Sequence, residues 1–173
     1  NRARSRWAYK FFLDTDIEAS APRTTDPVAL ADTNNPTLNN PNCTVCHTAM
    51  DPLAGAFQNY GEEGHFRVHG KDSLDQFYKY PDDGKTAYRD GDTWYRDMLA
   101  PGLLGELAPS PENSLQWAAA KMAQDPRFAR AAVKFWWPSI IGSELLIQPA
   151  VQSDANYEAK LMAYDAQSAA IQT

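Results

Sequence analysis

The stretch "NCTVCHTAM" (residues 42–50) contains both cysteines of the chain, Cys43 and Cys46, and it decides the expected fold. His47 follows the second cysteine directly, in a chain of 173 residues with two cysteines and three histidines. Three chemistries use such a pattern: a dithiol–disulfide switch, a zinc site, and the covalent attachment of a c-type haem. The neighbouring sequence decides among them.

The pattern Cys-x-x-Cys-His is the attachment signal for haem c. The two thiols add across the two vinyl groups of the porphyrin, and the two intervening residues let one helical turn span those points. The adjacent His47 then falls under the iron as its proximal ligand. The pattern uses the entire cysteine content, so neither thiol is left over for a structural disulfide. We therefore predict one covalently bound haem c, with Cys43 and Cys46 as the attachment residues.

The two other chemistries fit less well. A dithiol switch needs a strand-to-helix turn in a βαβ setting, whereas the flanks here are a Pro/Asn-rich loop and short pieces broken by glycines. A structural zinc site would combine Cys43 and Cys46 with His65 and His69, which have the histidine spacing of a zinc finger. The gap between the pairs is longer than in a finger, and "EGHFRVHG" (63–70) has glycines where a finger has a helix. Zinc stays the alternative, and solvated loop histidines are the simpler reading.

The iron of a haem also needs a sixth ligand or an open position. Met98, in "WYRDMLAPG" (94–102), lies roughly fifty residues after the motif and close to a proline, a placement similar to that of the axial methionine in class I cytochromes c. We predict Met98 as the distal ligand, with His65 or His69 as alternatives. Met50 is too close to His47 in the sequence to reach the opposite face of the haem.

The remaining methionines, Met122 and Met162, lie on apolar helical faces, where core packing is the default. The net charge of −6 comes without a long basic stripe, so nucleic acid is not an expected partner. The longest apolar run, "FWWPSIIGSELLI" (135–147), is broken by Pro138 and Glu144 and is too short to span a bilayer. We expect no transmembrane segment in this chain; membrane association would come through partners.

The class is predicted to be mainly α. A first helix is expected over residues 4–13. Its apolar side chains lie at near-helical spacing: Trp7 and Phe11, with Tyr9, Phe12 and Leu13 on the flank. Residues 19–42 are rich in Pro, Thr, Asn and Asp, which predicts a long loop that wraps something.

Later signals are turns and helix ends. Asp51-Pro52 is expected to end any short helix, because the residue before a proline is pushed out of the helical region. Residues 81–92 have two Asp/Gly turn signals and predict a small hairpin or loop. A single helical run is expected over residues 93–100, stopped by Pro101-Gly102.

The last third is expected to be helical. Ser110 is the predicted cap of a helix that starts at Pro111, and Asp125-Pro126 gives the same start signal to the next helix, which Pro138 kinks or ends. Asp154 is the predicted cap of a final helix. One face of that helix is formed by Tyr157, Leu161, Tyr164 and Ile171.

We expect two units: a haem c domain with the N-terminal helix and the wrapping loop (1–108), and a C-terminal helical segment packed on it (109–173). The chain begins without an initiator Met or a signal peptide, and it stops inside an expected helix. We interpret it as a processed chain or as a fragment of something longer.

A second pattern surrounds the haem motif. In "CTVCHTAMDPLAGAFQNYGEEGHFR" (43–67) the motif is followed by Asp-Pro-Leu, then an aromatic stretch, and a glycine that precedes an arginine. The matching residues are Asp51, Pro52, Leu53, Phe57, Tyr60, Gly64 and Arg67. The segment resembles the cytochrome-like domains of unknown function in large exported proteins of planctomycetes and myxobacteria. "DPRFARAAVKFWWPSIIG" (125–142) is similar to the helical region of the same family.

The resemblance implies a c-type haem, export to the periplasm, the cell surface or the medium, and membership of a larger chain. It implies no reaction. One haem motif without an obvious acid–base constellation favours electron transfer to a redox partner or to further domains. The alternatives are a haem oxidoreductase, or its electron-entry domain, with an open iron site, and a structural module. Calcium could bind such a module at the acidic loop residues Asp82, Asp83, Asp90 and Asp92.

Overall fold

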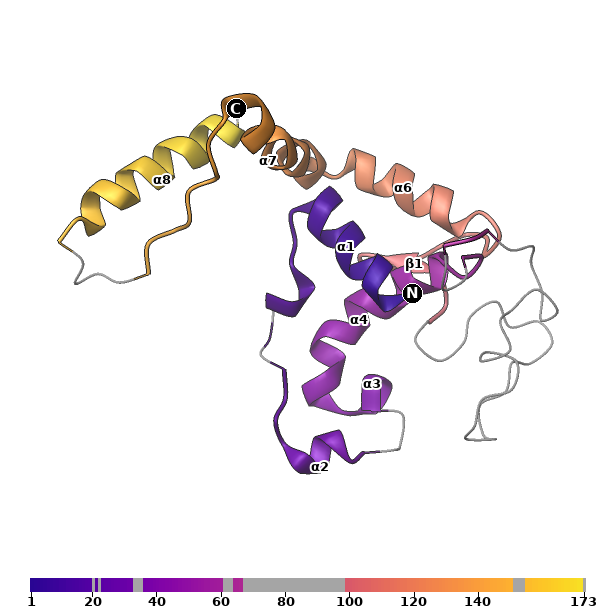
Figure 1. Cartoon of the computed structure of the whole chain (residues 1–173). Helices are drawn as coiled ribbons and strands as arrows, with labels where there is room; N and C mark the ends of the chain where they lie inside the picture. Colours follow the sequence, from indigo (N-terminus) through magenta and orange to yellow (C-terminus); the bar gives the residue numbers. More distant parts are fainter. Residues whose placement is uncertain are drawn as a thin grey trace, which may run out of the picture.

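The computed structural model describes residues 1–19, 21, 23–32, 36–60, 64–66, 99–150 and 155–172. Over these residues the chain is mainly helical, as predicted (Figure 1). The elements are α1 (Arg2–Leu13), the 3-10 turn η1 (Ile17–Ala19), α2 (Pro27–Leu30), α3 (Pro36–Asn39), α4 (Pro41–Ala56), β1 (Gly102–Leu103), β2 (Glu106–Leu107), α6 (Ser114–Gln124), α7 (Pro126–Ile141) and α8 (Tyr157–Gln172).

Several sequence predictions lie outside the described residues. They are the hairpin over 81–92 with its four acidic residues, the helical run over 93–98 with Met98, the second candidate histidine His69, and the cap Asp154.

Three of the helices, α2, α4 and α7, begin in the same way. In each, an Asp or Asn is the N-cap and a proline is the first helical residue. A residue before proline is held in the extended region, which is the conformation that an N-cap needs, and its side-chain oxygen accepts the N–H two residues on. The N-caps are Asp26, Asn40 and Asp125, which accept from Val28, Asn42 and Arg127 at 3.0, 3.0 and 2.9 Å. The predicted start of α7 is thus confirmed, and the expected loop over 19–42 contains two short helices.

A proline inside α4 contradicts one prediction. The helix was expected to end before Pro52, but α4 runs through it. Pro52 has no N–H to donate to the preceding turn, and α1 supplies other donors to carbonyls of that turn. The hydroxyl of Ser5 donates to the carbonyl of Met50 at 2.7 Å, and that of Tyr9 to the carbonyl of Ala49 at 3.3 Å. Hydrogen bonds from α1 therefore accompany the backbone hydrogen bond that is missing at Pro52.

The same contacts determine which face of α1 is buried. Trp7 and Phe11, two of the residues whose spacing predicted the helix, are each 43% exposed. The buried residues are Ser5, Ala8, Tyr9 and Leu13. Small side chains let α4 approach closely, and the two hydroxyl groups find carbonyl partners there. Apolar spacing located this helix correctly, and two of the residues that it placed on the flank, Tyr9 and Leu13, are buried.

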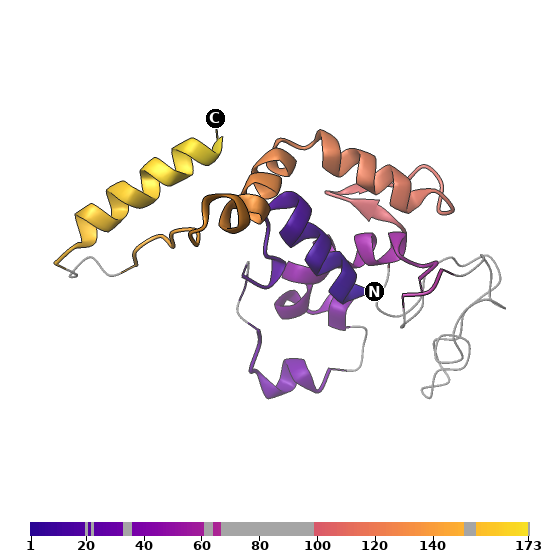
Figure 2. The same cartoon turned by 45° about the horizontal axis from the view of Figure 1, so that its top comes forward.

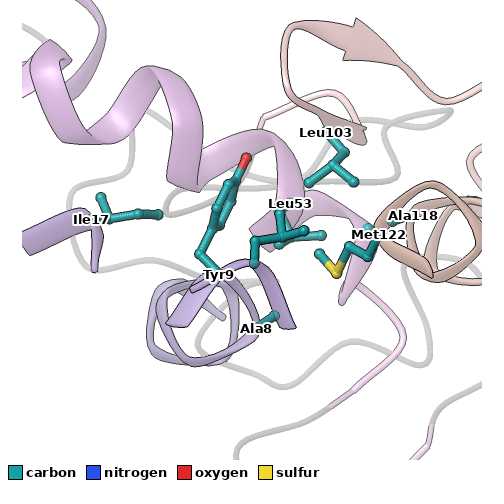
Figure 3. Packing of buried hydrophobic residues seen from close by; sticks show 9 residues of the cluster. Ala8, Tyr9, Ile17, Leu53, Leu103, Ala118 and Met122 are labelled. Carbon is teal, nitrogen blue, oxygen red and sulfur yellow. The ribbon is translucent and has the colours of Figure 1, made fainter. Parts of the chain in front are cut away.

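The core lies where α1, α4, β1 and α6 meet (Figure 3). Leu13 and Leu53 are fully buried at its centre, and Leu103 and Met122 pack beside them. Met122 thus packs in the core, as the default predicted, whereas Met162 on α8 is 72% exposed. Helix α6 thus contributes to the same core as α1 and α4. The predicted boundary between two units at residues 108 and 109 is not tested by these contacts and stays a prediction.

Strands β1 and β2 form a small antiparallel hairpin beside α4. Its two-residue loop, Leu104-Gly105, has φ angles of 54° and 84°. Positive φ at both loop positions defines the type I′ turn, which matches the twist of paired strands. Leucine is an unusual residue there, which is why no turn signal was visible in the sequence.

The start of α6 also differs from the prediction. Its N-cap is Asn113 instead of Ser110, so the helix begins later than expected. The carbonyl of Pro111 accepts hydrogen bonds from the amide of Gln58 at 2.9 Å and from the hydroxyl of Ser114 at 2.7 Å. These bonds hold residues 111–113 as a turn against α4.

Helix α7 packs on α1 through a charged contact. The carboxylate of Asp14, at the C-terminus of α1, binds Arg130 at 2.7 Å and Lys134 at 2.8 Å. Pro138 lies inside α7 and does not end it; the helix stops at Gly142, whose φ of 73° favours glycine.

Helix α8 lies beside α7, away from α4 (Figure 2). Its predicted face is the less exposed one, with Ile171 buried. Within the described parts of the chain, no helix is long and apolar enough to cross a membrane.

Gly55 is predicted to be required by packing. A methyl group at this position would lie 2.0 Å from the carbonyl oxygen of Leu99. Helix propensity alone favours alanine over glycine by about 1 kcal/mol, but overpacking typically costs about 1–3 kcal/mol. We expect Gly55→Ala to lower the free energy of unfolding in urea denaturation. The exposed Thr48→Ala in the same helix is the control and should not lower it; a stabilised Gly55→Ala would contradict the packing argument.

The cap of α7 is predicted to make stability depend on pH. Hydrogen bonds from Arg127, first from its side chain and then from its backbone, lower the pKa of Asp125 from 3.8 to about 2. The charged cap therefore stabilises the fold above about pH 4, and this stabilisation is lost as the pH falls toward about 2. At pH 7, Asp125→Ala should lower the free energy of unfolding by about 1 kcal/mol.

Asp125→Asn keeps a side-chain acceptor without the charge, so it should lose less stability at pH 7. The difference in stability between Asp125→Asn and the wild type, measured by thermal unfolding, should shrink as the pH falls from about 4 to about 2. A deficit that stays constant over this interval would show that the charge of Asp125 does not stabilise the fold.

Candidate functional site

One face of α4 carries the candidate site. Cys43, Cys46, His47 and Met50 are spaced at i, i+3, i+4 and i+7, so they lie on the same side of the helix. All four line one cavity of about 490 Å³. Val45, between the two cysteines, is 53% exposed on another side. The helix thus brings together the three residues that the sequence singled out.

The opposite walls come from the N-terminal part of the chain. Helix α1, the turn η1, residues 21, 23 and 24, and α2 each contribute. The residues from these segments are Arg2, Ala3, Arg6, Trp7, Glu18, Ala21, Arg23, Thr24 and Leu30, and Asn42 at the start of α4 completes the lining. Part of the segment expected to wrap something therefore encloses the face with the two thiols.

The two cysteines are not joined in a disulfide, and both are half-buried. The sulfur of Cys46 lies 3.5 Å from the carbonyl oxygen of Ile17. Two thiols outside any disulfide and an imidazole lie on one face, beside a cavity in the size range of cofactor pockets. This arrangement fits the requirements of a covalently attached haem.

The imidazole of His47 is held by a buried carboxylate. Its Nδ1 lies 2.9 and 3.1 Å from the two carboxylate oxygens of Asp51, one helical turn further along α4. Asp51 is 1% exposed, and the guanidinium of Arg2 donates to both of its oxygens, through Nε at 2.8 Å and Nη2 at 2.9 Å. Arg2, Asp51 and His47 form a continuous hydrogen-bonded chain from α1 to the wall of the cavity.

The charge of Asp51 determines the tautomer of His47. Burial alone would raise the pKa of Asp51, but hydrogen bonds from His47 and from Arg2 outweigh it, so the pKa lies below its usual value. An ionised carboxylate can only accept hydrogen bonds, so Nδ1 of His47 donates. The lone pair of Nε2 is then available to a metal, as a ligand histidine requires.

Positive charge gathers on the wall formed by α1 and residues 21, 23 and 24. Arg6 and Arg23 bind the two carboxylate oxygens of Glu18 at 2.8 and 2.7 Å. The Nε of Arg6 is buried and has no hydrogen-bond partner among the described residues. An anionic group in the cavity would meet these guanidinium groups and could satisfy that donor.

The sequence did not single out Asp51, Arg2 or Arg6 for a role at the site. The spacing of four residues between His47 and Asp51 was a signal for one of them, but it has meaning only if both lie on one helix. The expected helix end before Pro52 concealed it. No sequence pattern connects α1 to α4, so the two arginines could not be found in this way.

The zinc alternative and the distal ligand are only partly covered by the described residues. His65 is described and is exposed, while His69 and Met98 lie outside. Among the described residues, no three His, Cys, Asp or Glu side chains gather as a metal site. His65 therefore does not join the two cysteines, and the site with His69 stays a prediction.

Comparisons of this chain with protein families, curated proteins and solved structures find no match. The function is therefore inferred from the geometry of the cavity and from the motif.

The contact between α1 and α4 beside the cavity is predicted to depend on Ser5. Ser5 is fully buried and donates to the carbonyl of Met50. Ser5→Ala should lower the free energy of unfolding by about 1 kcal/mol, the usual contribution of such a hydrogen bond. Ser139→Ala, at an exposed position of α7, is the control for the change in helix propensity. Equal denaturation midpoints for both variants would mean that the Ser5 hydrogen bond contributes nothing.

Proposed function

We propose that this chain binds one haem c covalently and acts as an electron-transfer domain. The observation that carries the proposal is that Cys43, Cys46 and His47 line one cavity, with the two cysteines not joined in a disulfide. Each thiol would add across a vinyl group, the sulfur bonding to one vinyl carbon and the thiol hydrogen passing to the other. The haem would supply a one-electron iron couple. Nε2 of His47 would be the proximal ligand.

The charges of the cavity support this assignment. A haem carries two propionates, and the walls provide the guanidinium groups of Arg6 and Arg23. The buried Nε of Arg6 makes no hydrogen bond among the described residues, and the nearest paired carboxylate, that of Asp16, lies 3.7 Å from it. This atom is a donor suited to a propionate oxygen. These groups would orient the propionate edge toward α1 while the cysteines hold the opposite edge to α4.

The acid–base groups favour a carrier over a catalyst. Haem chemistry on a bound substrate generally uses an acid or base close to the open iron position. In the described lining, the carboxylate is Glu18, and two arginines hold it. Such a carboxylate is poorly placed to exchange protons with a ligand. A closed iron site, with Met98 as the distal ligand and His65 or His69 as alternatives, belongs to the same proposal.

Export from the cytoplasm and membership of a larger assembly complete the proposal. Covalent haem and the resemblance at residues 43–67 support export. An exposed apolar surface supports an assembly partner, either a redox protein or further domains of the same chain. Its residues on α7 are Val133, Phe135, Trp136, Ile140 and Ile141.

Intact-mass measurement tests the haem. The denatured wild-type protein should keep the mass of one haem, because thioether bonds survive unfolding. Cys43→Ala/Cys46→Ala should lose it, whereas the control Val45→Ala, on another face of the same turn, should keep it. A wild-type mass that equals the bare chain, or the chain plus zinc, would rule out the haem.

Carbon monoxide binding then separates a carrier from a catalyst. With two strong axial ligands, the ferrous wild type should bind carbon monoxide poorly. Ready binding at low concentration would contradict the electron-transfer assignment while leaving the covalent haem in place.

A further inference from the structure

We infer that Asp51 is a positioning residue for the proximal haem ligand: it fixes the ring of His47 through Nδ1 and shifts the iron couple toward the ferric state, and Arg2 limits the size of that shift. The inference rests on the proposed haem, and it concerns the chain's own residues.

The first step is the bond between Asp51 and His47. A histidine that ligates a metal usually donates its other ring N–H to an acceptor, which fixes the ring and raises the basicity of the ligand nitrogen. Here the acceptor is a carboxylate, with both oxygens within 3.1 Å of Nδ1. A carboxylate draws the Nδ1 proton more strongly than a backbone carbonyl does, because the bond is charge-assisted. The Nε2 atom of His47 gains electron density, which stabilises ferric iron over ferrous iron.

The second step is the burial of the carboxylate. Asp51 is 1% exposed, so water does not screen its charge as it would at the surface. His47 is itself largely buried, with a side-chain exposure of 19%. The negative charge therefore acts on the ring at close range in a poorly polarisable environment.

The third step is the competition from Arg2. Its guanidinium binds the same two oxygens, at 2.8 and 2.9 Å, and is itself partly exposed. A cation on these oxygens withdraws electron density from the bond to His47. Removal of Asp51 and removal of Arg2 should therefore move the reduction potential in opposite directions.

The experiment is a double-mutant cycle with the reduction potential as its readout. Asp51→Asn, Arg2→Gln and the double variant are made in the haem-loaded protein, and covalent haem is verified by intact mass. Asp51→Asn should favour ferrous iron about tenfold, which is about 59 mV for a one-electron couple. Arg2→Gln should lower the potential. In the Asp51→Asn background, Arg2→Gln should change the reduction potential clearly less, because Arg2 can no longer act on His47 through the carboxylate of Asp51.

A second readout separates the His47 route from a general electrostatic effect. The electron paramagnetic resonance spectrum of the ferric haem reports the ligand field of the axial imidazole. It should change in Asp51→Asn. An unchanged spectrum would overturn the inference even if the potential moves, since a distant charge shifts the potential without altering the ligand.

The remaining outcomes are also decisive. If Asp51→Asn keeps its covalent haem with the wild-type potential, the inference is wrong and the proposed function stands. If Asp51→Asn does not fold, Arg2→Gln decides through both readouts. A lower potential together with a changed electron paramagnetic resonance spectrum supports the inference, and an equal or higher potential, or an unchanged spectrum, overturns it. A wild type without covalent haem overturns the proposed function and the inference together.

Discussion

The structure depends on the burial of one charged carboxylate at the place where α1 crosses α4. Asp51 has almost no contact with solvent, and a buried charge is tolerated when it is paired and hydrogen-bonded. Its two oxygens accept from Arg2 on one side and from His47 on the other. One requirement, the neutralisation of this carboxylate, thereby joins the N-terminal helix to α4 and sets the orientation of the imidazole. Since α1 and α4 are also two walls of the cavity, the same hydrogen-bonded chain connects two walls of the site.

Proline has two opposite effects in this chain. At the starts of α2, α4 and α7 it follows an Asp or Asn, and the local geometry of the pair is enough to begin a helix. At Pro52 the same dipeptide lies within a helix. There the side chain of Asp51 is bound by Arg2 and His47, and α1 donates to carbonyls of the preceding turn. What an Asp-Pro pair does is thus decided by the partners of its carboxylate.

The C-terminal part is attached differently from the N-terminal part. Helix α6 contributes to the core, whereas α7 contacts α1 through aromatic side chains and through the pair of cations on Asp14. Much of the apolar surface of α7 remains exposed, and α8 contacts α7 (Figure 2). A surface of this kind is normally covered by protein in the working state. The site is therefore built from the N-terminal elements, while the C-terminal helices offer the larger area for contact with a partner.

Local chemistry in the sequence by itself determined the mainly α class, the Asp-Pro start of α7 and the haem-type motif with Cys43, Cys46 and His47. These follow from spacing within one turn or from the preferences of a dipeptide, and neither needs a distant partner. The tertiary structure decided which face of α1 is buried, why α4 passes through Pro52, and which residues support His47. Arg2 and Asp51 are far apart in the sequence, and their contact depends on how two helices cross. The sequence could not decide these points because an aspartate before a proline can cap a helix, lie at its end or bind a cation. Burial among specific neighbours selects one of these roles.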